Sequence, residues 1–294
     1  KDLLDVGLVD EKGETIMITR GMALSLYMHL MNPDNAKHLA RGGLTLPDLR
    51  EYYRYKGDRG FGTKEVRALG ISKELSDATA ELGKAKAALA EANANNQVEL
   101  IADLEAAVEA AKQARDDVLA KGDAYVNKLF NNVRKYINGD AYMTEWVSTM
   151  RQYFDVYSRG VLNETTMKVY GIKKASVDGY FPISSDSNFL QSPFESIVRD
   201  FSLENVGFMK ERTYGANPMY LFDATDVLSK SIRNTAQYAG MMPAIRSFNK
   251  IFQKTQSGWS DSLKNAINAK FGQDGIKYID NLMQDLNGAK AQDD

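Results

Sequence analysis

The segment from residue 72 to residue 121 constrains the fold of this chain more than any other part of the sequence. Fifteen of its 50 residues are alanine, none is aromatic, and Leu75, Leu82 and Leu89 lie seven residues apart. Apolar residues at heptad spacing are typical of helices that pack against one another along a narrow seam. The segment therefore predicts helices that meet through small side chains.

The second half of this segment repeats the pattern after a break. An asparagine-rich stretch at 93–97 separates the leucine heptads from a second apolar stripe that runs on toward residue 118. Two helices joined by a short polar turn form an antiparallel hairpin, and about 22 residues in each give a length of about 33 Å. The hairpin is predicted to project as an arm for docking or oligomerisation. The residues predicted to carry its interactions are Leu75, Leu82, Leu89, Ile101, Leu104 and Val108.

The rest of the chain has the opposite character, because all 29 aromatic residues lie outside the arm. Apolar residues there recur mainly at helical spacing, and only Thr15–Ile18 and residues 219–222 show brief strand-like patterns. The predicted fold class is all-α, a multi-helix bundle body with the projecting hairpin. Its predicted parts are residues 1–71 of the body, the arm at 72–121, and residues 122–294 of the body.

Helix ends in the body are marked by capping residues. Thr19 is a predicted N-cap, and Pro33 suits the first position of the next helix. Thr45 is expected to open a short third helix, Asp223 to begin a long one near the C-terminal end, and Pro243 to begin another.

Composition excludes several kinds of chemistry. The chain has no cysteine, which removes thiolate nucleophiles, disulfides and cysteine-ligated metals. Its two histidines, His29 and His38, lie nine residues apart across a proline, which is the wrong spacing for a two-histidine metal face. They are interpreted as ordinary core or surface residues, with a metal or general-base role as the alternative. We assign no catalytic residue, metal or cofactor.

Two functional alternatives remain open on charge. The net charge of −2 argues against a general nucleic-acid binder, but residues 205–259 hold seven basic and three acidic residues with aromatic residues between them. The predicted nucleic-acid-binding residues are Lys210, Arg212, Arg233, Arg246 and Lys250. The second alternative is an enzyme with a polar site near the Tyr-Phe-Pro-Ile loop at 172–192. Its candidate residues are Arg159, Glu164, Lys173 and Asp178.

Four stretches of the chain, at 17–39, 157–184, 208–232 and 237–252, resemble a known family when taken in order. They are similar to the helical domains of large polyvalent proteins encoded by tailed phages and other mobile elements, with the arm as an insertion. The residues that carry this resemblance are Thr19, Arg20, Gly21, Met22, Ala23, Leu24, Leu162, Asn163, Glu164, Tyr170, Gly171, Tyr180, Phe181, Pro182, Ile183, Arg212, Thr213, Gly215, Pro218 and Asp223.

The resemblance implies a non-enzymatic spacer or binding platform beside separate enzymatic modules in a long polypeptide. Its partners would be those modules or phage and host proteins, and its location the virion, the bacterial cytoplasm or both. The chain begins without Met, which favours a piece of a longer polypeptide, although removal of a tag would look the same. We predict no signal peptide and no membrane span, because the longest apolar-rich stretch, from Gly21 to Met31, is about half of the ~20 residues needed.

Overall fold

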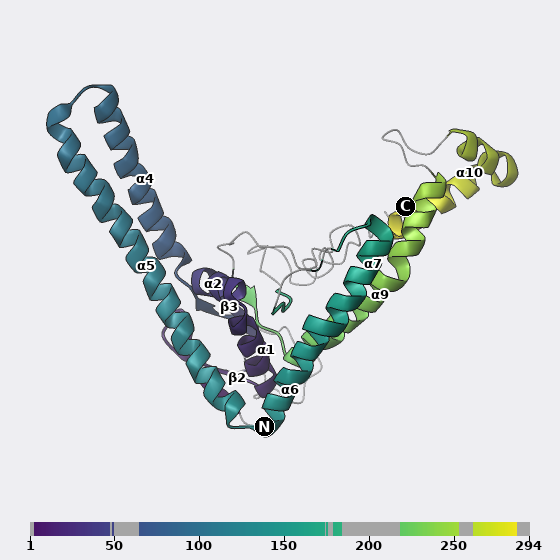
Figure 1. Cartoon of the computed structure of the whole chain (residues 1–294), viewed down its shortest axis with the longest axis horizontal. Helices are drawn as coiled ribbons and strands as arrows, with labels where there is room; N and C mark the ends of the chain where they lie inside the picture. Colours follow the sequence, from purple (N-terminus) through teal and green to yellow (C-terminus); the bar gives the residue numbers. More distant parts are fainter. Residues whose placement is uncertain are drawn as a thin grey trace. The chain divides into compact units, whose positions relative to one another are not determined.

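The computed structural model describes residues 3–47, 49, 65–173, 175, 179–183, 218–252 and 261–286, and helices dominate this part of the chain (Figure 1). The predicted class is confirmed to that extent, although two small sheets are also present. The described residues divide into two compact units. Unit 1 contains those up to Thr149 together with 181–183 and 218–227, and unit 2 contains the others.

Unit 1 begins with a β-hairpin. Strands β1 (Leu4–Val9) and β2 (Thr15–Ile18) pair antiparallel, and the Asp10 side chain accepts hydrogen bonds from the two amides of Lys12 and Glu14 in the turn. Val6, Leu8, Ile16 and Ile18 are buried on one face. The brief strand pattern at 15–18 is therefore a real strand.

Helices α1 (Arg20–Met31) and α2 (Pro33–Gly42) start where their caps predict. The Thr19 hydroxyl accepts a hydrogen bond from the amide of Met22, and the Asn32 side chain caps α2 with Pro33 at its first position. Gly43 ends α2 with φ of 79°, a backbone conformation that favours glycine. Local capping chemistry thus sets all of these ends.

The chain then enters a second sheet, where a prediction fails. Strand β3 (Gly43–Pro47) pairs antiparallel with β4 (Glu65–Leu69) and parallel with β5 (Met219–Tyr220). Thr45 lies in the middle of β3 instead of opening a helix. Leu44, Thr45 and Leu46 are all buried, so both faces of this segment are covered, and a central strand satisfies that condition with its backbone paired on both edges.

The two longest neighbouring helices of unit 1 form the segment singled out by the sequence. Helix α4 (Ser72–Ala94) turns at 95–97, where Asn96 has φ of 52°, and α5 (Val98–Asn138) runs back along it (Figure 1). The predicted boundary at residue 121 falls inside α5. We call residues 72–121 the arm.

A long helical run leads from unit 1 into unit 2, and two further helices follow it. Asp140 caps α6 (Ala141–Gln152), which continues through a π-helix, η1 (Tyr153–Ser158), into α7 (Arg159–Tyr170). Helix α9 (Ala224–Phe252) begins after Asp223, as predicted. Helix α10 (Asp261–Leu286) is interrupted at Gly272.

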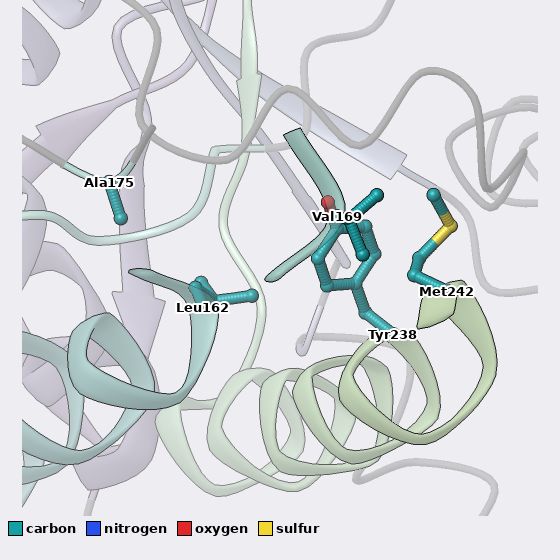
Figure 2. Packing of buried hydrophobic residues seen from close by; sticks show 5 residues of the cluster. All are labelled: Leu162, Val169, Ala175, Tyr238 and Met242. Atoms are coloured by element: carbon teal, nitrogen blue, oxygen red, sulfur yellow. The ribbon is translucent and has the colours of Figure 1, made fainter. Parts of the chain in front are cut away.

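Pro243 does not begin a helix, because α9 continues through it. Tyr238 and Met242 lie one turn apart on α9 and are both buried with Leu162 and Val169 of α7 and with Ala175 (Figure 2). Burial of the helix face in the turn before Pro243 offsets the backbone hydrogen bond that proline removes.

Candidate functional site

The arm is held together by a seam of large and small side chains between α4 and α5. Leu82 is buried at 4% exposure and Ala92 at 2%, and α4 makes most of its helix contacts with α5. The other predicted interaction residues, Leu75, Leu89, Ile101, Leu104 and Val108, are half-buried. All six side chains are therefore at least partly covered within the chain.

The base of the arm is fixed by close contacts to the rest of unit 1. Glu74 and Lys121 form an ion pair at 2.7 Å between the two helices. A Cβ on Gly122 would lie 2.8 Å from Cδ1 of Ile71, so α5 approaches the start of α4 as closely as glycine allows. Gly122 is also the first buried residue of α5.

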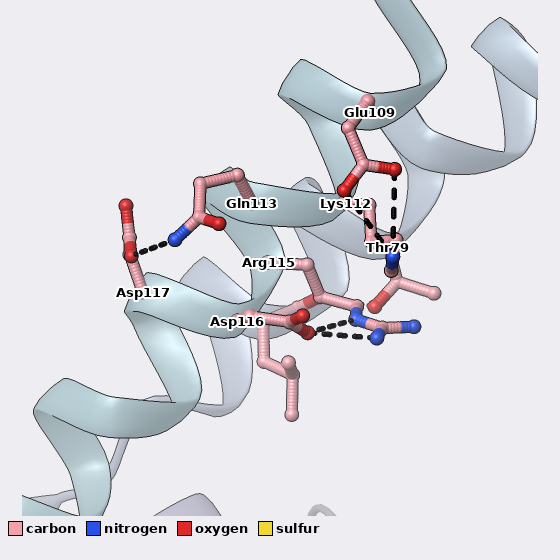
Figure 3. Close-up of polar contacts among 8 residues, drawn as sticks. Thr79, Glu109, Lys112, Gln113, Arg115, Asp116 and Asp117 are labelled. Carbon is pink, nitrogen blue, oxygen red and sulfur yellow. Dashed lines mark hydrogen bonds and ion pairs between the residues drawn. The ribbon is translucent and has the colours of Figure 1, made fainter. Parts of the chain in front are cut away.

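Between residues 109 and 117 the polar side chains of α5 contact one another along that helix (Figure 3). Lys112 lies 3.2 Å from Glu109, the Arg115 guanidinium contacts Asp116, and Gln113 donates to Asp117. The ion-paired side chains are between 34% and 70% exposed. Pairs this exposed contribute about 0–1 kcal/mol each. The arm thus depends on its seam.

The far end of the arm differs in charge from its base. From residue 87 to residue 111 the chain holds five carboxylates and no basic residue. Val98 and Leu100 lie at this end with exposed fractions of 74% and 48%. Both are exposed apolar side chains near the turn, in a stretch of sequence whose charged residues are all acidic. We call residues 87–111 the distal end.

The predicted nucleic-acid-binding residues are not brought together by the described part of the chain. Arg233 is exposed on α9. Arg246 and Lys250 follow on the same helix, but their side chains lie outside the described residues, as do Lys210 and Arg212. Nucleic-acid binding by this set stays a prediction.

The residues predicted near the Tyr-Phe-Pro-Ile loop have separate roles. The Arg159 Nε donates to the carbonyl of Ala175 at 3.3 Å. Glu164 is exposed and paired with Lys168, whose hydrogen bond and charge lower the pKa of Glu164. Lys173 is exposed, and Asp178 lies outside the described residues.

Asn163 is a position that sequence reasoning named only within a motif. Its side chain donates to the Ala175 carbonyl at 2.9 Å and accepts from the Ala175 amide at 2.8 Å, so it fastens the segment after α7. Ser158 of η1 contacts Thr235 of α9 through their hydroxyls, 3.1 Å apart. Polar side chains in unit 2 thus position the backbone and join helices.

A second motif residue joins two helix starts in unit 1. The Asp223 carboxylate accepts from the amide of Thr225 at the start of α9 and lies 3.5 Å from the Thr19 hydroxyl at the start of α1. A Cβ on Gly21 would overlap that carboxylate. Helix N-termini favour negative charge, and here the starts of α1 and α9 share one aspartate. Glycine at position 21 leaves room for the Asp223 carboxylate because it has no Cβ.

Both histidines are buried in unit 1, His29 at 2% and His38 at 7% exposure. Asn35 Nδ2 lies 3.3 Å from Nδ1 of His29 and 3.2 Å from the carbonyl oxygen of Phe181. The His29 ring also meets the Phe181 ring edge-on, with centroids 4.7 Å apart. The interpretation of His29 as a core residue satisfied by a neighbour is confirmed.

Comparison with known proteins adds no relative. No family model matches the chain, and neither the curated proteins nor the solved structures include a match. Across the described ranges, no three His, Asp or Glu side chains gather where they could hold a metal ion. In the same part of the chain, no helix has the length and apolarity needed to cross a membrane.

Proposed function

We propose that this chain is a non-enzymatic helical interaction module whose arm docks through its distal end onto a partner with a basic surface. The observation that supports this proposal most is the contrast between the covered seam of the arm and the exposed apolar residues at its distal end. Its apolar seam is occupied between α4 and α5, whereas Val98 and Leu100 face solvent among five carboxylates. Apolar groups exposed next to charge of one sign can be buried by a partner whose surface carries the opposite charge.

The proposal includes a helical bundle body from which the arm projects. The resemblance of four stretches to phage polyvalent proteins supports a place within a larger phage or mobile-element polypeptide, acting in the virion or after DNA delivery. The sequence of the parent polypeptide tests this context directly. Flanking enzymatic modules are expected, and an unrelated flank would contradict it.

The absence of cysteine makes a site-specific experiment available. Val98→Cys carrying a photoactivated crosslinker is expected to form one saturable adduct with a protein of the native host, identified by mass spectrometry. A second variant adds Glu99→Lys, Asp103→Lys and Glu105→Lys, and the adduct should then be lost because the charge attraction is reversed. Glu145→Cys, an exposed position on α6, is the matched control.

An adduct formed equally well from Glu145→Cys, or one indifferent to the charge reversal, would contradict the docking proposal. A deletion of residues 79–114 with a short Gly-Asn turn in their place keeps the Glu74–Lys121 pair at the base. It should melt cooperatively and form no partner complex. Global unfolding of this variant would contradict the projecting arm.

A further inference from the structure

Asn35 connects the His29 ring to the backbone carbonyl of Phe181. The chemistry of the three groups determines which of them donates and which accepts in these two hydrogen bonds. A carbonyl oxygen can only accept, so the group of Asn35 that faces Phe181 is its NH₂. The same nitrogen faces Nδ1 of His29 and has a second hydrogen to donate. His29 must therefore accept at Nδ1, which makes the ring neutral with its proton on Nε2.

Protonation of His29 breaks this link whichever way Asn35 responds. If Asn35 stays in place, two donors face each other at Nδ1. If its amide flips, the oxygen faces the Phe181 carbonyl and that hydrogen bond is lost. Because all three residues are at most 4% exposed, water cannot readily replace either bond.

Other titratable groups near His29 could also produce a response to pH, so we name those on the elements packed around it. Helix α1 packs against α2, α5 and β1, and Asp223 lies at its start. The charged or histidine side chains on these elements, taking α5 along the part beyond the arm, are Asp5, Arg20, Asp34, Lys37, His38, Arg41, Asp123, Lys128, Arg134, Lys135 and Asp223. The tyrosines on these elements are Tyr27, Tyr125 and Tyr136, and burial raises the pKa of Tyr125. His38 is the other buried group that ordinarily titrates near pH 6.5.

We propose that His29 and Asn35 form an acid-sensitive latch that holds the chain at Phe181 onto unit 1 and releases it when His29 is protonated. His29, Asn35 and Phe181 all belong to unit 1, so the latch acts within that unit. It is a conformational device independent of the docking proposed for the arm.

Hydrogen exchange of the full chain, measured by mass spectrometry on peptides that cover 179–183, tests the latch. After correction for intrinsic exchange, protection in the wild type should fall about tenfold between pH 7.5 and pH 5.0, the worth of one buried hydrogen bond. His29→Asn keeps an acceptor and cannot titrate, so its protection should not change with pH. His38→Asn should respond like the wild type.

Unchanged protection in the wild type, a response that survives in His29→Asn, or a response abolished by His38→Asn would each overturn the latch. Should His29→Asn fail to fold, nitrogen chemical shifts of labelled histidine in the wild type decide. The latch requires the proton of His29 on Nε2 at pH 7.5 and a titration that coincides with loss of protection. A proton on Nδ1 would rule it out.

Discussion

Helix α5 is one helix in two environments. Its first part, residues 98–121, belongs to the arm and contains no buried residue, whereas Val126, Leu129, Val133 and Ile137 in its last part are at most 7% exposed. Backbone geometry is the same throughout, so tertiary contact alone separates the two parts. Helix formation by itself therefore says little about which residues of α5 hold the fold together.

The two parts of α5 differ in burial because they pack against side chains of different size. Along the arm, α5 packs against α4 through a seam in which alanine alternates with larger side chains. Beyond residue 121 it meets α1, α2 and β1 with aliphatic and aromatic side chains, as in the stacked rings of Tyr27 and Phe130. Burial at about 25 cal/mol per Å² then concentrates stability in the body.

The largest expected effect comes from one substitution made in both parts of α5. Leu129→Ala should lower the free energy of unfolding by about 3 kcal/mol, since Leu129 is 2% exposed and its loss leaves a cavity. Leu104→Ala, at a half-buried seam position, should cost about 1 kcal/mol. Urea denaturation followed by circular dichroism measures both. Equal losses would break the comparison.

Glycine-to-alanine substitutions should have opposite signs in the two regions. Gly21→Ala should destabilise unit 1 by about 1–2 kcal/mol, because the new methyl displaces Asp223 from the start of α1. Gly83→Ala on α4 meets nothing within 4 Å and should stabilise the arm by up to about 1 kcal/mol. Thermal melts compare the variants. In an Asp223→Ala background the penalty of Gly21→Ala should largely disappear, and a persisting penalty would contradict the clash.

Local signals explain what the sequence predicted well. At the starts of their own helices, Thr19, Pro33 and Asp223 act within one helical turn, so these capping roles follow from residue type alone. The strand at Thr45 and the continuation of α9 through Pro243 depend instead on neighbours distant in the sequence. The partners of Asn163 and Asn35 were missed for the same reason. The lack of basic residues at 87–111 can be read from the sequence, but the basic residues elsewhere in the arm conceal it when the arm is taken as a whole.

Alkaline pH should affect the stability of unit 2 through tyrosine ionisation, an effect that the arm cannot show because it contains no tyrosine. Burial, followed by the charge and hydrogen bond of Tyr170, raises the pKa of Tyr238 to about 12. The unfolded chain loses this proton near pH 10, so the stabilising contribution is complete below pH 10 and is lost as pH rises toward 12. The melting temperature of unit 2 should fall by a few degrees over that range. Tyr238→Phe should reduce the fall, and an unchanged fall would assign it to other groups.

The smallest expected effect is at the base of the arm, where the two environments of α5 meet. Glu74 and Lys121 are 52% and 64% exposed, so water screens their ion pair. Lys121→Ala should therefore change the free energy of unfolding by less than about 0.5 kcal/mol, and 1 M salt should remove most of that difference. A double-mutant cycle with Glu74→Ala isolates the pair from helix propensity. A coupling above about 1 kcal/mol would mean that charge, and not the fit of Gly122 against Ile71, anchors the arm to the body.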